Sequence, residues 1–379
     1  DKIINIINNN KSVILLGPRQ TGKTTLVHKI KHDRYLNLIH PELRQRYEAA
    51  PGSLIAEIIS LNKSLNYKPT IIIDEIQKVP KLADSIQLLI DEQIANFILT
   101  GSSARKLTNL LPGRVIKFSL RPLALSELGN LNLTLEQILT NGLLPGIVMN
   151  SINSELDLNS YVSLYLEEEI RKEALVRNLG AFHNFLKLSC IGSGEQISFR
   201  SIAQEIGVTH NTVAEYYRIL QDCMLVEVIM PITISTTRRK LTKHPKYLIF
   251  DLGVRRIGAM ETAPIAIHQM GRIFEQFVGL ELVKILNYTP TASLHYWRCH
   301  TGIEVDYIIS VNHKYIPIEV KWTNKPSIQD AKHLIKFQAE YSNATHGYII
   351  CNIPYAMAIN EQITALPWNH LINFSLDKI

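Results

Sequence analysis

The stretch SVILLGPRQTGKTTL, which begins at Ser12, constrains the fold of this chain more than any other part of its sequence. An apolar run, Val13–Leu16, leads into a segment that matches the pattern G-x-x-x-x-G-K-[ST] at every fixed position. The glycines let the backbone curl so that its N–H groups face phosphate oxygens, and the following helix adds its positive N-terminal end. The pattern predicts a strand, a phosphate-binding loop and a helix, although a Gly-rich turn can also match by chance.

The loop predicts a nucleotide ligand, and we expect ATP with Mg²⁺. Lys23 would reach the β- and γ-phosphates, and the Thr24 hydroxyl would ligate Mg²⁺. The complete set of predicted nucleotide-binding residues is Gly17, Pro18, Arg19, Gln20, Thr21, Gly22, Lys23, Thr24 and Thr25.

A second motif, TIIIDEIQKV, places two carboxylates directly after an apolar run. Ile71–Ile73 predicts a strand buried on both faces, and ligands of open α/β sheets gather at the carboxyl ends of such strands. Asp74 would hold the Mg²⁺ shell, and Glu75 would act as the catalytic residue that polarises the attacking water. A simple strand end is the alternative.

A third run, NFILTGSSARKL, predicts a neighbouring strand that ends in polar residues. Ser102 is our candidate for sensing the γ-phosphate, with Ser103 as the next choice and a plain polar turn as the alternative. Arg114 and Arg121 follow, and Arg114 is the first candidate for an arginine that acts on the ATP of a neighbouring subunit. We therefore expect a homo-oligomer, although a solvated surface arginine is the simpler interpretation.

Together these segments resemble the AAA-type branch of P-loop ATPases, which has an extra strand between its two Walker motifs. GPRQTGKTTL, IIIDEIQ, ILTGSSARKL and LPGRVIKFSLRPLALSEL are similar to a family of prokaryotic ATPases that carry an uncharacterised C-terminal region. The resemblance extends over nearly the whole chain. It implies an α/β domain with a parallel sheet over residues 1–130 and Mg²⁺-dependent ATP hydrolysis.

The middle of the chain predicts helices over 131–195, as a lid or connector, and a winged helix-turn-helix over 196–262. A short helix ends at Gly207, Thr209 is placed to cap the next helix, and two apolar runs would form the wing strands. Residues 209–212 would meet a DNA groove, or the region would serve as a packing lid or subunit contact. The basic residues assigned to phosphates are Arg238, Arg239, Lys240, Lys243 and Lys246.

The last segment, 263–379, combines a helix carrying Glu275 with a strand carrying Asp306 and the strand YIPIEVKW. Strand side chains alternate between faces, so Glu319 and Lys321 would point the same way. This order resembles the PD-(D/E)xK nuclease fold, a restriction-endonuclease-like α/β domain. Segment 295–310 would be one strand, forming a hairpin with YIPIEVKW.

The nuclease resemblance implies that Glu275, Asp306 and Glu319 hold Mg²⁺, with Mn²⁺ as an alternative, while Lys321 orients a water. Gln338 and Tyr341 resemble a helix motif beside the metal of some such nucleases. The alternative is a partly buried Glu–Lys pair in an inactive fold.

Composition sets the remaining expectations. The 379 residues are 46% hydrophobic and 20% charged, with a net charge of +6, which excludes wholesale disorder and permits contact with nucleic acid. The four cysteines are far apart, and no apolar run approaches the roughly 18 residues of a membrane span. We expect a cytoplasmic protein with no membrane association.

The predicted function is ATP hydrolysis coupled to action on nucleic acid, DNA more than RNA, including cleavage by the C-terminal domain. A nucleotide-controlled switch whose nuclease-like domain binds partners is the main alternative, and a small-molecule kinase is a weaker one.

Overall fold

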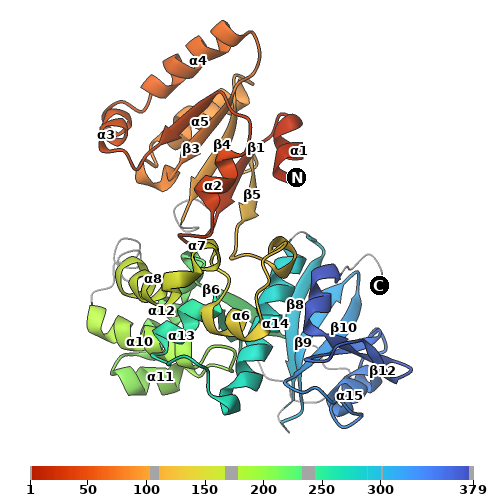
Figure 1. Ribbon diagram of the computed structural model, residues 1–379. Coiled ribbons are helices and arrows are strands. Elements are labelled where there is room, and N and C mark those ends of the chain that lie inside the picture. Colours follow the sequence, from red (N-terminus) through yellow and green to blue (C-terminus); the bar gives the residue numbers. More distant parts are fainter. Residues whose placement is uncertain are drawn as a thin grey trace. The chain divides into compact units, whose positions relative to one another are not determined.

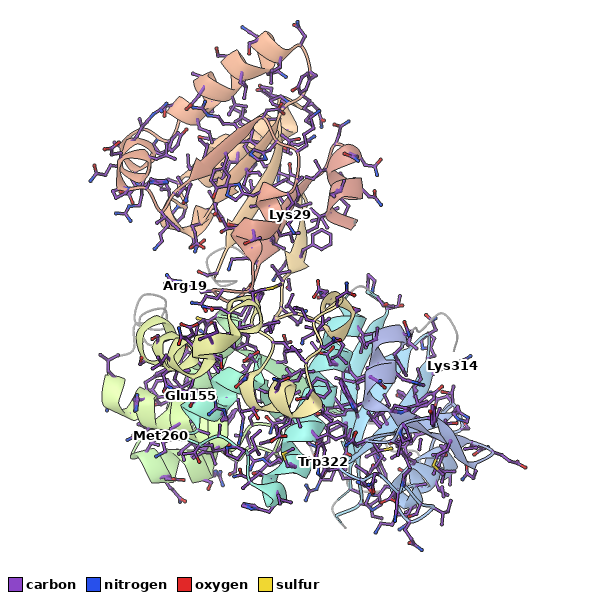
Figure 2. All side chains as sticks on the ribbon, in the orientation of Figure 1. Arg19, Lys29, Glu155, Met260, Lys314 and Trp322 are labelled. Carbon is purple, nitrogen blue, oxygen red and sulfur yellow. The ribbon has the colours of Figure 1, made fainter. Side chains whose placement is uncertain are left out.

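A computed structural model describes residues 2–102, 111–166, 178–232, 244–287, 289–299 and 302–374 (Figure 1). The chain divides into two compact units. The first comprises residues 1–121 with 222–224, and the second comprises residues 122–221 with 225–379. Side chains fill the space between the elements of each unit (Figure 2).

The first unit is built on a sheet of five parallel strands in the order β2-β3-β4-β1-β5. The predicted strands of the three motifs are confirmed as β1, β3 and β4, and β4 lies between the other two, as the AAA-type resemblance implies. The strands are β1 Ser12–Leu16, β2 Arg34–Asn37, β3 Thr70–Asp74, β4 Asn96–Gly101 and β5 Val115–Ser119.

Helices cover both faces of this sheet (Figure 1), which explains why its three central strands, β3, β4 and β1, contain continuous apolar runs. Val13 and Leu15 pack with residues of α1 and α2, whereas Ile14 and Leu16 belong to the core formed with α4 and α5. The helices are α1 Lys2–Asn8, α2 Lys23–His28, α3 Pro41–Ala49, α4 Ser53–Leu65 and α5 Leu82–Asp91.

The second unit begins with a helical region, as predicted for the middle of the chain. Its helices are α6 Leu135–Asn141, α7 Pro145–Met149, α8 Ser154–Ser160, α10 Leu179–Ile191, α11 Phe199–Ile206, α12 His210–Asp222 and α13 Leu252–Gly258. Gly207, with a φ of 69°, turns the chain between α11 and α12. The hydroxyl of Thr209 accepts a hydrogen bond from the backbone N–H of Thr212 at 3.2 Å, so the predicted helix cap is confirmed.

The second unit also contains an eight-stranded mixed sheet, in the order β12-β13-β11-β10-β9-β8-β6-β7. The strands are β6 Val226–Pro231, β7 Lys246–Ile249, β8 Ala292–Arg298, β9 Glu304–Val311, β10 Lys314–Lys321, β11 Gly347–Cys351, β12 Met357–Asn360 and β13 Ile363–Pro367.

The two strands assigned to a wing, β6 and β7, do pair antiparallel, but β6 also pairs with β8 and so extends the C-terminal sheet. The prediction of one strand over residues 295–310 is wrong, because this segment contributes to two antiparallel strands, β8 and β9. Arg238, Arg239, Lys240 and Lys243 lie outside the described residues.

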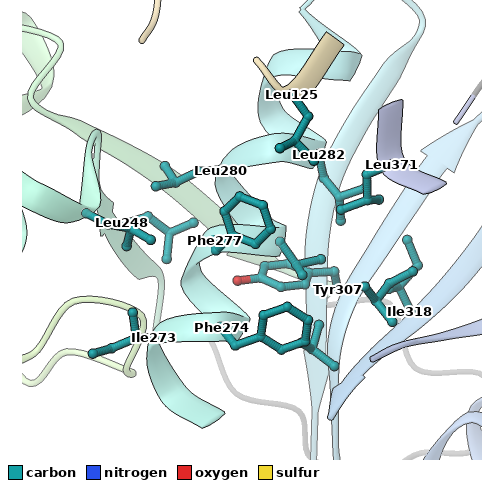
Figure 3. Close-up of a cluster of buried hydrophobic side chains, with 14 of the residues drawn as sticks. Leu125, Leu248, Ile273, Phe274, Phe277, Leu280, Leu282, Tyr307, Ile318 and Leu371 are labelled. Atoms are coloured by element: carbon teal, nitrogen blue, oxygen red, sulfur yellow. The ribbon is translucent and has the colours of Figure 1, made fainter. Parts of the chain in front are cut away.

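Two helices sandwich this second sheet, α14 Met270–Leu286 and α15 Lys332–Glu340. Figure 3 shows Phe274 and Phe277 of α14 around the ring of Tyr307, with Ile318 of β10 beside it. The Tyr307 hydroxyl donates to the carbonyl oxygen of Glu275 at 3.0 Å. On the opposite face, α15 packs Leu334 and Phe337 against β9 and β11.

Within the described parts of the chain, no helix has both the length and the apolar character needed to cross a lipid bilayer.

Gly279→Ala should destabilise the second unit, because a methyl group at Gly279 would overlap the Tyr307 hydroxyl where α14 meets β9. Overpacking of this kind typically costs about 1–3 kcal/mol. Urea unfolding would measure the change, with Gly146→Ala in α7 as control, because a methyl group there meets nothing within 4 Å. Equal stability of Gly279→Ala and wild type would contradict the prediction.

Candidate nucleotide site and a second acidic cluster

The loop after β1 has the curled backbone that its glycines predict. A side chain at Gly17 would overlap the carbonyl oxygen of Leu120, and Gly22 has a φ of 88° directly before α2. Gln20 also has a positive φ, 62°, and the Thr21 hydroxyl donates to the Pro18 carbonyl at 2.8 Å. The loop conformation therefore depends on glycine at position 17 for space and at position 22 for its backbone angle.

Lys23 lies inside this loop and is only 6% exposed. Its amine donates to the carbonyl oxygens of Gly17 and Pro18, both at 2.8 Å. These carbonyl bonds can be exchanged for bonds to anionic oxygens, which bind an ammonium group more strongly. Arg19, labelled in Figure 2, is partly buried, and Thr25 is exposed in the first turn of α2.

The carboxylate of Asp74, at the end of β3, accepts hydrogen bonds from three hydroxyl groups. Thr24 donates to Oδ2 at 3.0 Å, and Tyr35 donates to the same oxygen at 2.8 Å. Thr100 donates to Oδ1. The two predicted Mg²⁺ residues, Thr24 and Asp74, are thus in direct contact although they are 50 positions apart in the chain.

Sequence reasoning missed Tyr35 of β2. Burial raises the pKa of its hydroxyl, and the hydrogen bond to Asp74 and the negative charges of Asp74 and Glu75 raise it further. Tyr35 therefore stays protonated and remains a donor to Asp74. Only the pairing of β2 with β3, in which Tyr35 lies opposite Ile72, brings it to this carboxylate.

Glu75 and Ser102 are brought together by a residue that was not predicted, Gln77. The side-chain nitrogen of Gln77 donates to Glu75 Oε2 at 2.6 Å and to Ser102 Oγ at 3.0 Å. Glu75 itself has a φ of 61°, and its N–H donates to the Thr100 hydroxyl at 3.1 Å. Ser103, the next sensor candidate, lies outside the described residues.

The first of the two candidate arginines, Arg114, pairs with a carboxylate of its own chain. Arg114 donates from Nε to Asp91 of the same chain at 2.7 Å, and Arg121 is partly buried. Action of Arg114 on a neighbouring subunit would require it to leave Asp91, and that role stays a prediction.

The second cluster lies on the hairpin of β9 and β10. Asn312 and His313, with φ values of 48° and 63°, form its two-residue turn. Lys321 Nζ lies 2.6 Å from Glu319 Oε1, as expected for side chains on one strand face. The N–H of Val320 donates to Asp306 Oδ2 at 2.8 Å, which brings Asp306 next to Glu319.

Glu275 of α14 is paired with Lys246 of β7, and this pair was not anticipated. Lys246 is 4% exposed, and its amine lies 3.0 Å from Glu275 Oε1 and 2.5 Å from Glu304 Oε1. The prediction that Lys246 contacts nucleic acid phosphates is therefore wrong, because the residue is buried within the sheet. The local sequence does not indicate that Lys246, the last of the basic residues assigned to phosphates, is buried in the sheet.

Two carboxyl groups of this cluster, those of Asp306 and Glu319, are buried without full compensation of their charge or hydrogen bonds. Burial raises the pKa of Asp306 well above its usual range, and the charges of Glu319 and Glu275 add to this, while Lys321 and Lys246 oppose it. Glu319 is 2% exposed, and its Oε2 has no hydrogen-bond partner within the described residues. Both observations suit a cation between Asp306 and Glu319.

The described residues of this cluster do not form a complete metal site. No group of three or more His, Cys, Asp or Glu side chains in the described parts of the chain could hold a metal ion. Glu275, the predicted third ligand, is held by Lys246. Asp306 and Glu319, which is itself paired with Lys321, are the two predicted ligands that remain, and water or substrate would have to supply the other ligands of a metal there.

Helix α15 approaches the cluster through a residue that was not predicted. His333 Nδ1 lies 3.7 Å from Glu319 Oε1. The suggested motif residues point elsewhere: Gln338 donates to the Thr345 carbonyl at 2.9 Å, and Tyr341 stacks on Phe337 in the core. The expectation that Gln338 and Tyr341 lie beside the cluster is wrong.

Asp306→Asn should stabilise the protein at pH 7 in metal-free buffer. A carboxyl whose folded-state pKa is raised costs stability above that pKa, and the cost decreases as pH falls from the folded-state pKa to the pKa of the unfolded chain. The gain should therefore shrink toward about pH 4, the pKa of an unfolded aspartate. Thermal unfolding from pH 4 to 8 measures it, and Asp91→Asn, whose pKa is lowered by Arg114, should show no gain. A pH-independent difference would contradict the assignment.

Three sequence families match this chain in succession. Residues 9–129 match the AAA domain family, residues 132–262 match a domain of unknown function (DUF8612), and residues 270–371 match another (DUF4143). Each match covers less than half of the 379 residues.

Relatives over most of the length are themselves uncharacterised. The chain is 27% identical over 331 residues to the uncharacterized protein Rv2008c of Mycobacterium tuberculosis, covering 83% of this chain and 71% of that protein. The uncharacterized protein Mb2031c of Mycobacterium bovis matches with the same values.

Solved structures show only weak likeness. A STAND protein with a tetratricopeptide repeat sensor, PH0952 from Pyrococcus horikoshii, has 14% identity and a TM-score of 0.26, covering 76% of this chain and 45% of that one. The replication initiator DnaA, bound to AMPPCP and single-stranded DNA, has 14% identity and a TM-score of 0.29, covering 57% and 85%. The chain thus carries an AAA-type P-loop ATPase domain, followed by two regions that match families of unknown function.

Proposed function

We propose that the first unit binds ATP with Mg²⁺ and hydrolyses it, and that the second unit acts on nucleic acid. The ATPase assignment is supported above all by the hydrogen bond from Thr24 to Asp74, which joins the end of the phosphate-binding loop to the end of β3. Hydroxyl and carboxylate oxygens are the hard ligands that Mg²⁺ prefers. The bound Mg²⁺ would neutralise charge on the phosphates.

Lys23 and the backbone of the loop have different roles in this proposal. Lys23 would exchange the carbonyl oxygens of Gly17 and Pro18 for phosphate oxygens, and its positive charge would balance the β- and γ-phosphates. The backbone N–H groups between Gly17 and Gly22 would surround the same phosphates.

Glu75 would accept a proton from the attacking water, and Ser102 would contact the γ-phosphate. Glu75 follows Asp74 directly, and its positive φ turns its side chain away from the path of the strand. Backbone strain at a non-glycine residue is common at functional sites. A homo-oligomer with Arg114 acting between subunits completes this proposal.

Action on nucleic acid is proposed for the second unit on a separate observation, the contact of Lys321 with Glu319 beside Asp306. Asp306 and Glu319 would hold Mg²⁺ or Mn²⁺, and Lys321 would orient a water or offset charge on a phosphate. The rival function is a nucleotide-controlled switch, in which the same residues form an inert ion-pair cluster and the unit binds partners.

Glu75→Gln should bind ATP as wild type does but hydrolyse it about 10²–10⁴-fold more slowly, because an amide cannot accept the proton of water. Isothermal titration with a nonhydrolysable ATP analogue and a phosphate-release assay measure the two properties. The control Lys23→Ala should lose binding, since the phosphate charge is then unbalanced. Turnover of Glu75→Gln at the wild-type rate would remove Glu75 from the catalytic role.

Glu319→Ala should abolish cleavage of plasmid DNA by the full-length protein in Mg²⁺ or Mn²⁺, because it removes one of two metal-binding carboxylates. Gel electrophoresis with and without ATP follows the cleavage. Glu361→Ala, at an exposed site of the same unit, is the matched control and should cleave normally. If wild type leaves DNA and RNA intact under all of these conditions, the switch becomes the better proposal.

A further inference from the structure

Gln77 connects the ends of two neighbouring strands through its side-chain amide. It lies in a short 3₁₀ helix, Ile76–Lys78, directly after β3, and it is 8% exposed. Its nitrogen donates to Glu75 at the end of β3 and to Ser102 just after β4. An amide NH₂ group has two hydrogens, so both bonds form at once.

The orientation of this amide follows from its neighbours. If its oxygen and nitrogen were exchanged, the amide oxygen would face the Glu75 carboxylate, and two acceptors would repel each other. In the present orientation Gln77 Oε1 is buried with no hydrogen-bond partner among the described residues. Leaving a buried acceptor unpaired costs stability. In the present orientation, the two hydrogen bonds donated by the amide nitrogen offset this cost.

The backbone of Glu75 is already held in place without Gln77. Its φ is 61°, and its N–H donates to the Thr100 hydroxyl, which in turn donates to Asp74. What these bonds leave undetermined is the rotamer of the Glu75 side chain. The 2.6 Å bond from Gln77 to Oε2 restrains this rotamer and, with it, the direction of the other carboxylate oxygen.

We propose that Gln77 is a positioning residue that orients Glu75 for proton transfer and links it to the sensor residue Ser102. The inference rests on the proposed ATPase function and names a residue that this function had not used. A shift of the Ser102 hydroxyl on nucleotide binding would move the amide, and the amide would move the carboxylate. One hydrogen bond of Gln77 reaches Ser102, the residue assigned to the γ-phosphate, and neither of its two bonds goes to a residue assigned to Mg²⁺.

Gln77→Met tests this because methionine keeps the length of the side chain and removes both donors. We expect kcat to fall about 10- to 100-fold, the size of effect that a misplaced catalytic group produces. KM for ATP and the Kd of a nonhydrolysable ATP analogue should stay within about twofold of wild type, since positioning acts on proton transfer and not on ground-state binding. Gln45→Met, at an exposed position of α3, is the matched control.

A double-mutant cycle separates positioning from a general structural defect. In a Glu75→Gln background, Gln77→Met should cause no further loss of kcat, because the group that it orients is already disabled. An equal additional loss in that background would show a structural role and overturn the inference. Wild-type kcat in Gln77→Met, or a large loss of analogue binding, would overturn it as well.

Two further outcomes are distinguishable. If Gln77→Met fails to fold, Gln77→Leu also removes both donors with an apolar side chain of similar volume, and it should show the same fall in kcat. If wild type binds no analogue and releases no phosphate, the proposed ATPase function fails and this inference fails with it. Hydrolysis by wild type with an unaffected Gln77→Met variant overturns this inference alone.

Discussion

The first unit depends on how the carboxylate of Asp74 is satisfied. Asp74 is 1% exposed, and a carboxyl group buried to that extent costs stability unless it is hydrogen-bonded. The three hydroxyl donors come from α2, β2 and β4, so one side chain ties the end of the loop to three strands of the sheet. A change in the bonding of Thr24 is therefore felt by Tyr35 and Thr100 through a shared acceptor.

Hydrogen bonds also connect the sheet to Glu75, the predicted catalytic residue. Thr100 donates to Asp74 and accepts from the N–H of Glu75, and Gln77 joins Glu75 to Ser102. All five of these residues lie within two of the sequence motifs, but the hydrogen bonds that involve Thr100 and Ser102 connect the ends of two different strands. The arrangement connects Ser102 and Glu75, the residues proposed to sense the nucleotide and to activate water, through one side chain.

In the second unit, several carboxylates lie close together and are balanced by lysines. Four carboxylates of this unit lie near two lysines, and each lysine pairs with different carboxylates. The four are Glu275, Glu304, Asp306 and Glu319. Lys246 pairs with Glu275 and Glu304, and Lys321 pairs with Glu319. Burial and the neighbouring carboxylates raise the pKa of Asp306, although both lysines oppose this. Because Lys246 is contributed by β7, the metal-binding or inert character of the cluster depends on a strand that precedes the C-terminal region in sequence.

Local patterns in the sequence determined the phosphate-binding loop, the strands around it, the helices of the middle region and the shared strand face of Glu319 and Lys321. Each of these follows from residues that are close in the chain, where periodicity and backbone geometry act directly. Tertiary structure alone decided that β6 extends the C-terminal sheet, that Lys246 is buried against Glu275, and that Tyr35 and Gln77 meet Asp74, Glu75 and Ser102. These contacts join side chains through strand pairing and sheet order, and a one-residue change of register would turn the same side chains to the opposite face.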